Sequence, residues 1–584
     1  VDKVVLRILG GAEQHTMVFP KKVEVLMSAD GDDYYKVAEW QKSLPDDSHY
    51  IFLPEEGYPY VYPLRLECGN RLARYIVFKI EPASRLFLDE VAVIEGCYPP
   101  APVDDGTVKV PFKLNSAMLW SEMDALFVCN NMPIFDRVIF SDLRNTPDQV
   151  SLIFELPLGV ELLKAYRNSK ELIVSYNPVN YDGKAFNQYQ IQLTAPNSYE
   201  NIEVWLTTNW KDGEKGQAFI YAQWPGGQQE KVVTPTYAYS IKEATPPRRL
   251  HTSIAWMGES FQQRWPDFFL TYKNLGFNAV PFFPRWWSQT DWEKQARDLG
   301  FQIIYNESPL HVMANSFKNM DEIYVLYDDG KRGEQVSLAY RGQYYEHEMQ
   351  RVSQLAETLK PDWVFFDMEL FSGYVPVSRK DQQLIQRLTQ ERWGSVSEAC
   401  VYLGTEILTD LTNAVKGWSE GDNKPLVGFY NMHATSVYQD IFDFQSVYPN
   451  VVDLAQPSQY YGGNAAKVGD QIRKIRQLLP KGDIIPWLTA GTYGEFPSQN
   501  MRDMVLETFF NGARGITFYL YTDFNGLDFK YTSEAITIAT KVEDIIMDGQ
   551  LISCEKLVSD NKNARVIGLE KQNGEAAILV SNYV

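Results

Sequence analysis

Two carboxylates one residue apart, Asp367 and Glu369, end an apolar run in the segment PDWVFFDMEL (361–370). A carboxylate buried without a partner costs several kcal/mol, so the pair is either compensated structurally or does chemistry. Residues two apart on a strand point the same way, about 6.6 Å apart along it. Mutual repulsion and partial burial then raise the pKa of one of them, as an acid catalyst near neutral pH requires. The structural alternative is an ion pair with Arg285 or another basic group.

The elements that position this pair begin at His251, where apolar strands start to alternate with helical periods. The strand candidates are 252–260, 277–284, 301–308, 362–369, 426–433, 451–461, 484–491 and 515–524. Helical patterns include 343–359, 381–392, 466–479, 498–513 and 533–547. Eight strand–helix units predict a (β/α)8 TIM barrel over 251–548. An open α/β sheet is the competitor, but no Gly-x-Gly-x-x-Gly follows the first strand.

The predicted strands end in aromatic, amide and charged residues, at the edge where barrels build their active sites. The residues at these ends are Trp256, Glu259, Arg285, Trp286, Trp287, Glu307, Tyr430, Asn431, His433, Gln456, Gln459, Tyr460, Trp487, Tyr493, Tyr521 and Asp523. Aromatic rings stack on the C–H faces of sugars, while carboxylates and amides hydrogen-bond sugar hydroxyls. Each residue alone has a structural alternative, such as packing at the barrel rim. Their shared location predicts a sugar-binding site.

The motif Asp-x-Glu at the end of strand four, with Tyr after strand six, resembles glycoside hydrolases of the chitinase-type family 18. It is similar in general plan to the hexosaminidase families 20 and 123. Family 18 has the longer motif Asp-x-x-Asp-x-Asp-x-Glu, and Phe365 replaces one of its acids here. Families 20 and 123 place the Asp and Glu side by side, whereas Met368 separates them in this chain.

This resemblance implies roles for three residues in substrate-assisted cleavage of an N-acetylhexosaminide. Glu369 would be the general acid/base, Asp367 would stabilise the 2-acetamido group that attacks the anomeric carbon, and Tyr460 would hydrogen-bond that group. The alternative resembles fucosidases and α-galactosidases, in which an Asp that ends strand four is the nucleophile. Asp367 would then attack, and the acid would be one of Glu259, Glu307, Glu495 and Asp523.

Two further functional classes are alternatives to glycoside hydrolysis. A non-catalytic glycan-binding or scaffold barrel fits the aromatic strand ends but does not need two carboxylates in one pocket. A phosphoryl or metal-dependent hydrolase is disfavoured, because the sequence has no His cluster and no Gly-rich phosphate loop.

Two β-rich regions precede the barrel, and a short one follows it. Residues 1–97 and 107–245 alternate apolar and polar residues between Asp-Gly, Gly and Asn turns, which predicts two β-sandwiches. In the first, FPKKVEVLMSADGDDYYKVAEW, ARYIVFKIEP and LFLDEVAVIEG resemble the discoidin jelly roll, a coagulation-factor C-type module shared with many carbohydrate-binding modules. That resemblance allows a structural calcium ion, without a ligand set in the sequence. The Pro-rich segment 97–106 is predicted to be a linker, and 551–584 a β appendage.

The composition of the chain limits the classes of molecule that it is expected to bind. The formal net charge of −20 is opposite to the basic surface that nucleic acid requires. No segment reaches the roughly 18 apolar residues of a membrane helix. The five cysteines are scattered and the histidines lack metal-ligand spacing, so no cofactor is expected to be required. We therefore expect an oligosaccharide or polysaccharide partner. The resemblance to discoidin modules joined to sugar-processing barrels implies a periplasmic or extracellular location.

Overall fold

The computed structural model consists of two compact units, Val1–Leu114 and Asn115–Val584, and each is described by itself. The structure describes all residues except 11–18, 30–33, 42–59, 70, 83–86, 95–106, 109–116, 120–124, 141–148, 182, 197–199, 230, 232, 284–290, 327–330, 369–382, 385–386, 388–389, 392–394, 420–423, 432–440, 443, 462–463, 480–482, 492–495, 562–563 and 583–584.

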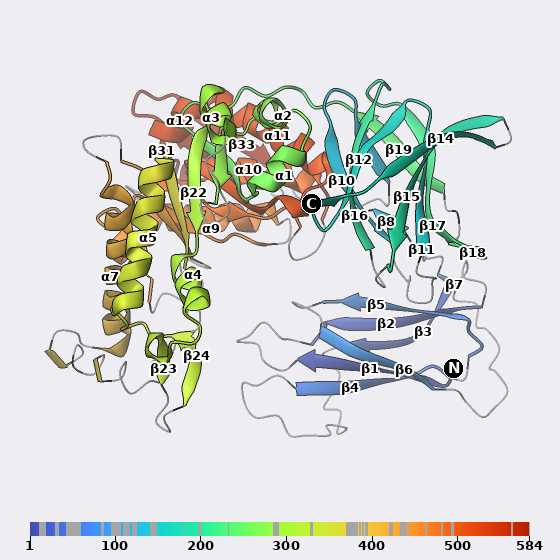
Figure 1. The fold of residues 1–584 in the computed structure, drawn as a ribbon, viewed down its shortest axis with the longest axis horizontal. Coiled ribbons are helices and arrows are strands. Elements are labelled where there is room, and N and C mark those ends of the chain that lie inside the picture. Colours follow the sequence, from blue (N-terminus) through green and yellow to red (C-terminus); the bar gives the residue numbers. More distant parts are fainter. Residues whose placement is uncertain are drawn as a thin grey trace. The chain divides into compact units, whose positions relative to one another are not determined.

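The first unit is a sandwich of two antiparallel sheets, with the strand orders β4–β1–β6 and β5–β2–β3–β7 (Figure 1). Its strands are β1 (Lys3–Gly10), β2 (Lys22–Ser28), β3 (Tyr34–Gln41), β4 (Tyr60–Glu67), β5 (Tyr75–Glu81), β6 (Phe87–Ile94) and β7 (Thr107–Val108). Alternate residues such as Val4, Leu6 and Val25 are buried between the sheets, as the period of two along a strand requires. Because β7 pairs with β3, this unit extends beyond residue 97, where the sequence predicted its end.

The second unit begins with two more sheets, ordered β13–β12–β16–β10–β8 and β14–β15–β11–β17–β19–β9. Their strands are β8 (Ala117–Leu119), β9 (Leu126–Cys129), β10 (Ile134–Phe140), β11 (Gln149–Pro157), β12 (Val160–Arg167), β13 (Lys170–Glu171), β14 (Val174–Tyr181), β15 (Lys184–Thr194), β16 (Glu200–Thr208), β17 (Lys215–Trp224), β18 (Gly227–Gln228) and β19 (Val233–Tyr239). Phe135 packs on Phe261 with ring centroids 5.4 Å apart, and Trp205 on Trp265 at 5.5 Å. These sheets therefore share a core with the region after His251.

Parallel strands follow from His251, one for each strand position that the sequence predicted. They are β20 (His251–Trp256), β21 (Ala279–Phe282), β22 (Gln302–Glu307), β25 (Trp363–Asp367), β26 (Leu426–Asn431), β27 (Leu454–Pro457), the pair β28 (Asp483–Ile484) and β29 (Trp487–Leu488), and β30 (Gly515–Leu520). Pairing runs β21–β22–β25–β26–β27–β28 and β29–β30–β20. Asn278 joins β21 to β20, because its backbone N–H donates to Thr252 O at 3.2 Å and its Oδ1 accepts from Thr252 N at 2.9 Å. This is the strand order of a (β/α)8 barrel.

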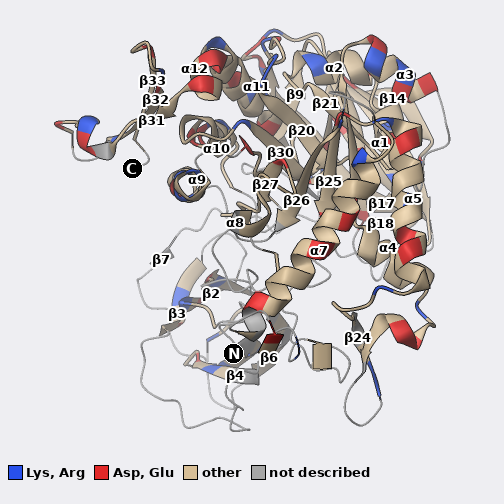
Figure 2. Ribbon diagram, turned by 90° about the vertical axis from the view of Figure 1, so that its left-hand side faces the viewer, with Lys and Arg blue, Asp and Glu red and all other residues tan. Residues whose placement is uncertain are grey.

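Helices lie between these strands, and α5 and α7 run side by side (Figure 1). They are α1 (Glu259–Arg264), α2 (Phe268–Asn274), α3 (Asp291–Asp298), α4 (Pro309–Ser316), α5 (Gln343–Leu359), α7 (Val396–Lys416), α8 (Phe444–Val447), α9 (Ala465–Leu478), α10 (Gln499–Phe510), α11 (Gly526–Lys541) and α12 (Glu543–Asp548). Most of the predicted helix 381–392 lies outside the described residues. Charged residues lie mainly on helices and loops, whereas the barrel strands are largely uncharged (Figure 2).

Shorter elements complete the unit. A hairpin of β23 (Tyr324–Leu326) and β24 (Arg332–Val336) follows the turn η2 (Asp321–Ile323), and η5 (Tyr521–Asp523) follows β30. The C-terminal sheet contains β31 (Gln550–Leu551), β32 (Arg565–Glu570) and β33 (Ala576–Ser581), with η6 (Cys554–Lys556) between the first two. In the described part of the chain, no helix is long and apolar enough to cross a membrane.

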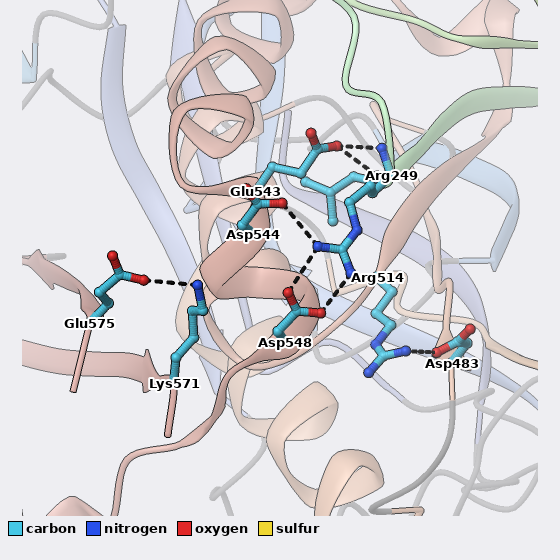
Figure 3. Close-up of polar contacts among 9 residues, drawn as sticks. Arg249, Asp483, Arg514, Glu543, Asp544, Asp548, Lys571 and Glu575 are labelled. Atoms are coloured by element: carbon cyan, nitrogen blue, oxygen red, sulfur yellow. Dashed lines mark hydrogen bonds and ion pairs between the residues drawn. The ribbon is translucent and has the colours of Figure 1, made fainter. Parts of the chain in front are cut away.

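Three acidic residues of α12, Glu543, Asp544 and Asp548, bind the segment that leads into the first barrel strand (Figure 3). The Glu543 carboxylate is almost fully buried and accepts the backbone N–H groups of Arg249 and Leu250 at 2.6 and 2.9 Å. The Arg249 guanidinium donates to Asp544 at 2.9 Å and to Asp548 at 2.6 Å. Glu543 thus supplies acceptors that two backbone donors need at the start of a buried strand.

Replacing this buried acceptor should destabilise the second unit. Glu543→Ala leaves the two N–H groups without it, so we expect the free energy of unfolding to fall by about 2–4 kcal/mol. Denaturant titrations followed by tryptophan fluorescence measure the effect. The control is Glu575→Ala, because Glu575 forms an exposed pair with Lys571 at 2.8 Å and its loss should leave the transition unchanged. Equal shifts for the two variants would contradict the role of Glu543.

Asp136 on β10 is a buried acid, and the hydrogen bond that holds it comes from the backbone N–H of Arg137 at 2.7 Å. Burial raises the pKa of Asp136 from 3.8 to about 7. A raised pKa means that the stability contributed by the protonated acid is complete below pH 4 and is lost as the pH rises through about 7.

Asp136→Asn should remove this pH dependence, because the amide keeps an acceptor oxygen and cannot ionise. We expect the variant to match the wild type near pH 4 and to exceed it by up to about 4 kcal/mol above pH 8. Unfolding midpoints of both proteins between pH 4 and 9 provide the measurement. A difference that does not change with pH would show that Asp136 does not titrate in this range.

Candidate active site

Strand β25 presents Asp367 to the barrel interior. Trp363 and Phe365 belong to the apolar cluster inside the barrel, whereas Val364 and Phe366 pack with the surrounding helices. Side chains alternate along a strand, so Asp367 continues the inner series at the carboxyl end. It is partly exposed, unlike the four residues before it. The Asp367 carboxylate therefore lies at the carboxyl end of the barrel, where the sequence predicts a site.

Four aromatic side chains stand beside this acid, and we call them the aromatic wall: Tyr430, Tyr460, Trp487 and Tyr519. Tyr430 is the register partner of Asp367 on the neighbouring strand β26. Its ring centroid is 4.8 Å from that of Trp487 and 6.5 Å from that of Tyr460, and Tyr460 lies 5.8 Å from Tyr519. Tyr430, Trp487 and Tyr519 lie on β26, β29 and β30, and Tyr460 follows β27, so the four rings form a continuous aromatic cluster next to Asp367 in which Tyr430 and Trp487 are buried. Tyr519 is an addition to the predicted residues.

Amide side chains complete the described interior. Asn306 of β22 donates from Nδ2 to Ala255 O at 3.1 Å, while its Oδ1 has no partner in the described chain. Gln456 of β27 is fully buried, and neither amide atom has a partner among the described residues. Gln459 donates from Nε2 to Ser458 O at 2.6 Å, and its Oε1 has no partner in the part of the chain that the structure describes. The polar groups suit hydroxyl-bearing ligands.

Glu307 lies elsewhere, although it ends the neighbouring strand β22. Ile303 and Tyr305 face the helices, and Glu307 has the same parity. Its carboxylate accepts from Arg351 of α5 at 3.2 Å and is 2% exposed. The structure therefore assigns Glu307 to an ion pair between strand and helix, and it places Asn306, an addition to the predicted residues, in the interior.

The other described strand-end residues lie on the side of the first and last strands. Trp256 packs on the inner cluster and stacks on Phe283 at 5.2 Å. Glu259 begins α1 and accepts from Gln263 at 2.9 Å. Asp523 is buried and interacts electrostatically with Arg137 of β10. Tyr521 stacks on Phe261 at 3.7 Å. Tyr521 and Asp523 therefore lie toward the preceding β-sheets, whereas Trp256 packs with the inner cluster that includes the aromatic wall.

Several predicted site residues lie outside the described part of the chain. They are Arg285, Trp286, Trp287, Glu369, His433, Tyr493 and Glu495. The expected pKa coupling between Asp367 and Glu369, and an ion pair with Arg285, therefore stay predictions. In the described residues, no group of three or more His, Cys, Asp or Glu side chains is placed to hold a metal ion. A calcium ion in the first unit likewise stays a prediction.

No family model and no curated protein matches the chain. The solved structures that resemble it include a GH36 α-galactosidase from Geobacillus stearothermophilus in complex with raffinose, at 12% identity and a TM-score of 0.38 over 76% of this chain and 69% of that one. A Bacteroides ovatus GH5 xyloglucanase has 9% identity and a TM-score of 0.29 over 72% and 100%. The catalytic domain of a Pyrococcus furiosus chitinase has 11% identity and a TM-score of 0.30 over 52% and 98%. These neighbours are glycoside hydrolases, and each has a TM-score below 0.5 to this chain.

The opposite placement of two strand-end acids can be tested directly. Glu307→Gln should lower the free energy of unfolding by about 1–3 kcal/mol, because it removes the charge that faces Arg351, and should leave glycan turnover unchanged. Asp367→Asn should abolish turnover with little change in stability. Denaturation and activity assays on both variants provide the comparison, with exposed Glu357→Gln on α5 as control. Loss of turnover in Glu307→Gln with intact folding would place Glu307 in the site.

Proposed function

We propose that this chain is a glycoside hydrolase that cleaves a complex glycan at the carboxyl end of the barrel. The observation that carries the proposal is Asp367, a carboxylate on the inner face of β25 directly beside the aromatic wall. Glycoside hydrolysis requires either two carboxyl groups or one together with a substrate group. Glu369 follows two residues later in the sequence and is the second carboxylate.

In the substrate-assisted form of this mechanism, the substrate is an N-acetylhexosaminide and cleavage retains the anomeric configuration. Glu369 protonates the leaving oxygen and then activates water, while Asp367 holds the 2-acetamido group for attack on the anomeric carbon. Tyr460 donates a hydrogen bond to that group. This assignment is supported by the position of Tyr460, whose ring lies 6.5 Å from the ring of Tyr430, the register partner of Asp367.

The alternative mechanism uses Asp367 as a covalent nucleophile. A separate acid must then protonate the leaving group. The ion pair of Glu307 with Arg351 removes it from the four candidates, which leaves Glu259, Glu495 and Asp523. The partial exposure of Asp367 fits a nucleophile as well as a stabiliser.

Chemical rescue separates these mechanisms. If Asp367 is the nucleophile, Asp367→Ala is inactive and azide restores turnover by attacking the anomeric carbon, which yields a glycosyl azide of inverted configuration. If Asp367 only holds the acetamido group, azide restores nothing to this variant, and substrates without a 2-acetamido group are not cleaved by the wild type. NMR detection of the glycosyl azide and of its anomeric configuration distinguishes the two.

The acid/base role of Glu369 is tested by how turnover depends on the leaving group. Glu369→Ala should lose about 100- to 10,000-fold in turnover of glycosides with poor leaving groups and much less with good ones, because good leaving groups need no protonation. Aryl glycosides of graded leaving-group pKa measure this. Equal losses across the series would assign the acid to another residue.

A non-catalytic glycan-binding barrel is the second candidate, and the aromatic wall favours it independently of any acid. Glycan binding by the wild type without turnover of any screened glycan, and without change in Asp367→Asn, would support this reading over hydrolysis.

A further inference from the structure

Two buried side chains, one in the aromatic wall and one beside it, carry polar atoms that have no partner in the described chain. They are Gln456, through Oε1 and Nε2, and Trp487, through Nε1. Gln456 is 0% exposed and Trp487 is 1% exposed. A buried polar atom without a hydrogen bond costs about 1–3 kcal/mol. Such atoms are rare in folded proteins, and each one calls for an explanation.

These two side chains belong to one place in the barrel. Gln456 is the register partner of Tyr430, and the ring of Tyr430 lies 4.8 Å from that of Trp487. Ser458, two residues after Gln456, bridges to Trp487 on the next strand. The amide and the indole N–H therefore adjoin the aromatic wall rather than scattered parts of the core.

Gly428 on β26 makes room for this amide. A Cβ atom built on Gly428 would lie 2.7 Å from Gln456 Oε1 and 3.0 Å from Leu454 Cβ. Gly428 is not among the glycines with a positive φ angle, so its backbone conformation is open to any residue. The glycine is therefore explained by the space that the Gln456 side chain occupies.

We propose that Gln456 and Trp487 form a hydroxyl-reading subsite for a neutral sugar, an inference that rests on the glycan substrate proposed above. A glutamine amide presents an acceptor and a donor side by side. One hydroxyl of a vicinal diol donates to Gln456 Oε1, and the neighbouring hydroxyl accepts from Nε2. The Trp487 N–H donates to one of the same hydroxyls, while the sugar's C–H face stacks on the wall. The Gln456 Oε1 acceptor requires a donor, which a hydroxyl provides and an ionised carboxylate or sulfate group does not.

Ligand discrimination tests the subsite. The background is the full-length double variant Asp367→Asn, Glu369→Gln, which keeps ligands intact. The probes are methyl glycosides of glucose, galactose, mannose and N-acetylglucosamine, with their 2-, 3- and 4-deoxy analogues where these exist, measured by calorimetry. Gln456→Met keeps the side-chain length and loses both hydrogen-bonding groups. We expect it to weaken binding of the preferred sugar about 10- to 100-fold and to bind the matching deoxy analogue unchanged.

The controls separate structure from recognition. Gln477→Met, at an exposed site on α9, should change nothing. Gly428→Ala should weaken binding of the same sugar, because the added methyl group displaces the Gln456 amide. Because Gln456→Met removes unsatisfied polar atoms, its unfolding midpoint should equal or exceed that of the background.

Two results would overturn the subsite. If the background binds a sugar and Gln456→Met keeps the same preference over the deoxy analogue, the amide does not read hydroxyls, and the glycosidase proposal stands. If the protein without any substitution binds and cleaves no glycan at all, both proposals fall together.

Discussion

The alternation of side chains along parallel strands is the constraint on which the barrel and its site depend. Each strand lies between two different cores, one inside the barrel and one under the helices, so successive residues must suit opposite environments. In β22, Ile303 packs with the helices and Ile304 with the interior. The same alternation sends Asn306 inward and Glu307 to Arg351. A shift of one residue would exchange an amide for a carboxylate inside the barrel.

The chain has a net charge of −20 and still buries several acids, and each is compensated in its own way. Glu543 accepts two backbone N–H groups, while Glu307 and Glu507 pair with arginines at 3.2 and 2.8 Å. Burial holds the pKa of Asp136 near 7, so that this acid is protonated over part of the physiological range. Asp367 differs from all four, because it is partly exposed at the inner end of a strand. Its position fits contact with a ligand better than a purely structural role.

Strand positions could be predicted from the sequence, because apolar runs bounded by turns and helical periods mark them clearly. The predicted runs 426–433 and 451–461 contain β26 and β27. The division of the seventh predicted strand, 484–491, into β28 and β29 was not predicted. Pro486 has no N–H to donate, so ladder pairing stops at Ile484 and resumes at Trp487.

The positions of some candidate site residues could also be predicted from the strand pattern. Asp367, Tyr430 and Trp487 follow from strand ends alone. The direction of the Glu307 side chain does not follow from the sequence. In FQIIYNE both sets of alternate residues contain apolar side chains, so the pattern does not show which set faces the barrel interior. Only the packing of Ile304 inside the barrel fixes that phase, and with it the inward direction of Asn306.

Both ends of the barrel interior bury polar side chains. At the amino end, hydrogen bonds of 2.8 Å link His251 to Ser253 and Ser253 to Thr517, while His251 Nδ1 has no partner among the described residues, and burial lowers the pKa of His251 to about 3, so that its ring is neutral. At the carboxyl end, the fully buried Gln456 amide has no partner among the described residues. An interior selected for stability alone would fill that position with an apolar side chain, which costs nothing to bury. A polar group kept there at a cost to folding is best explained by what it binds, since proteins tolerate such local conflicts mainly where function requires them.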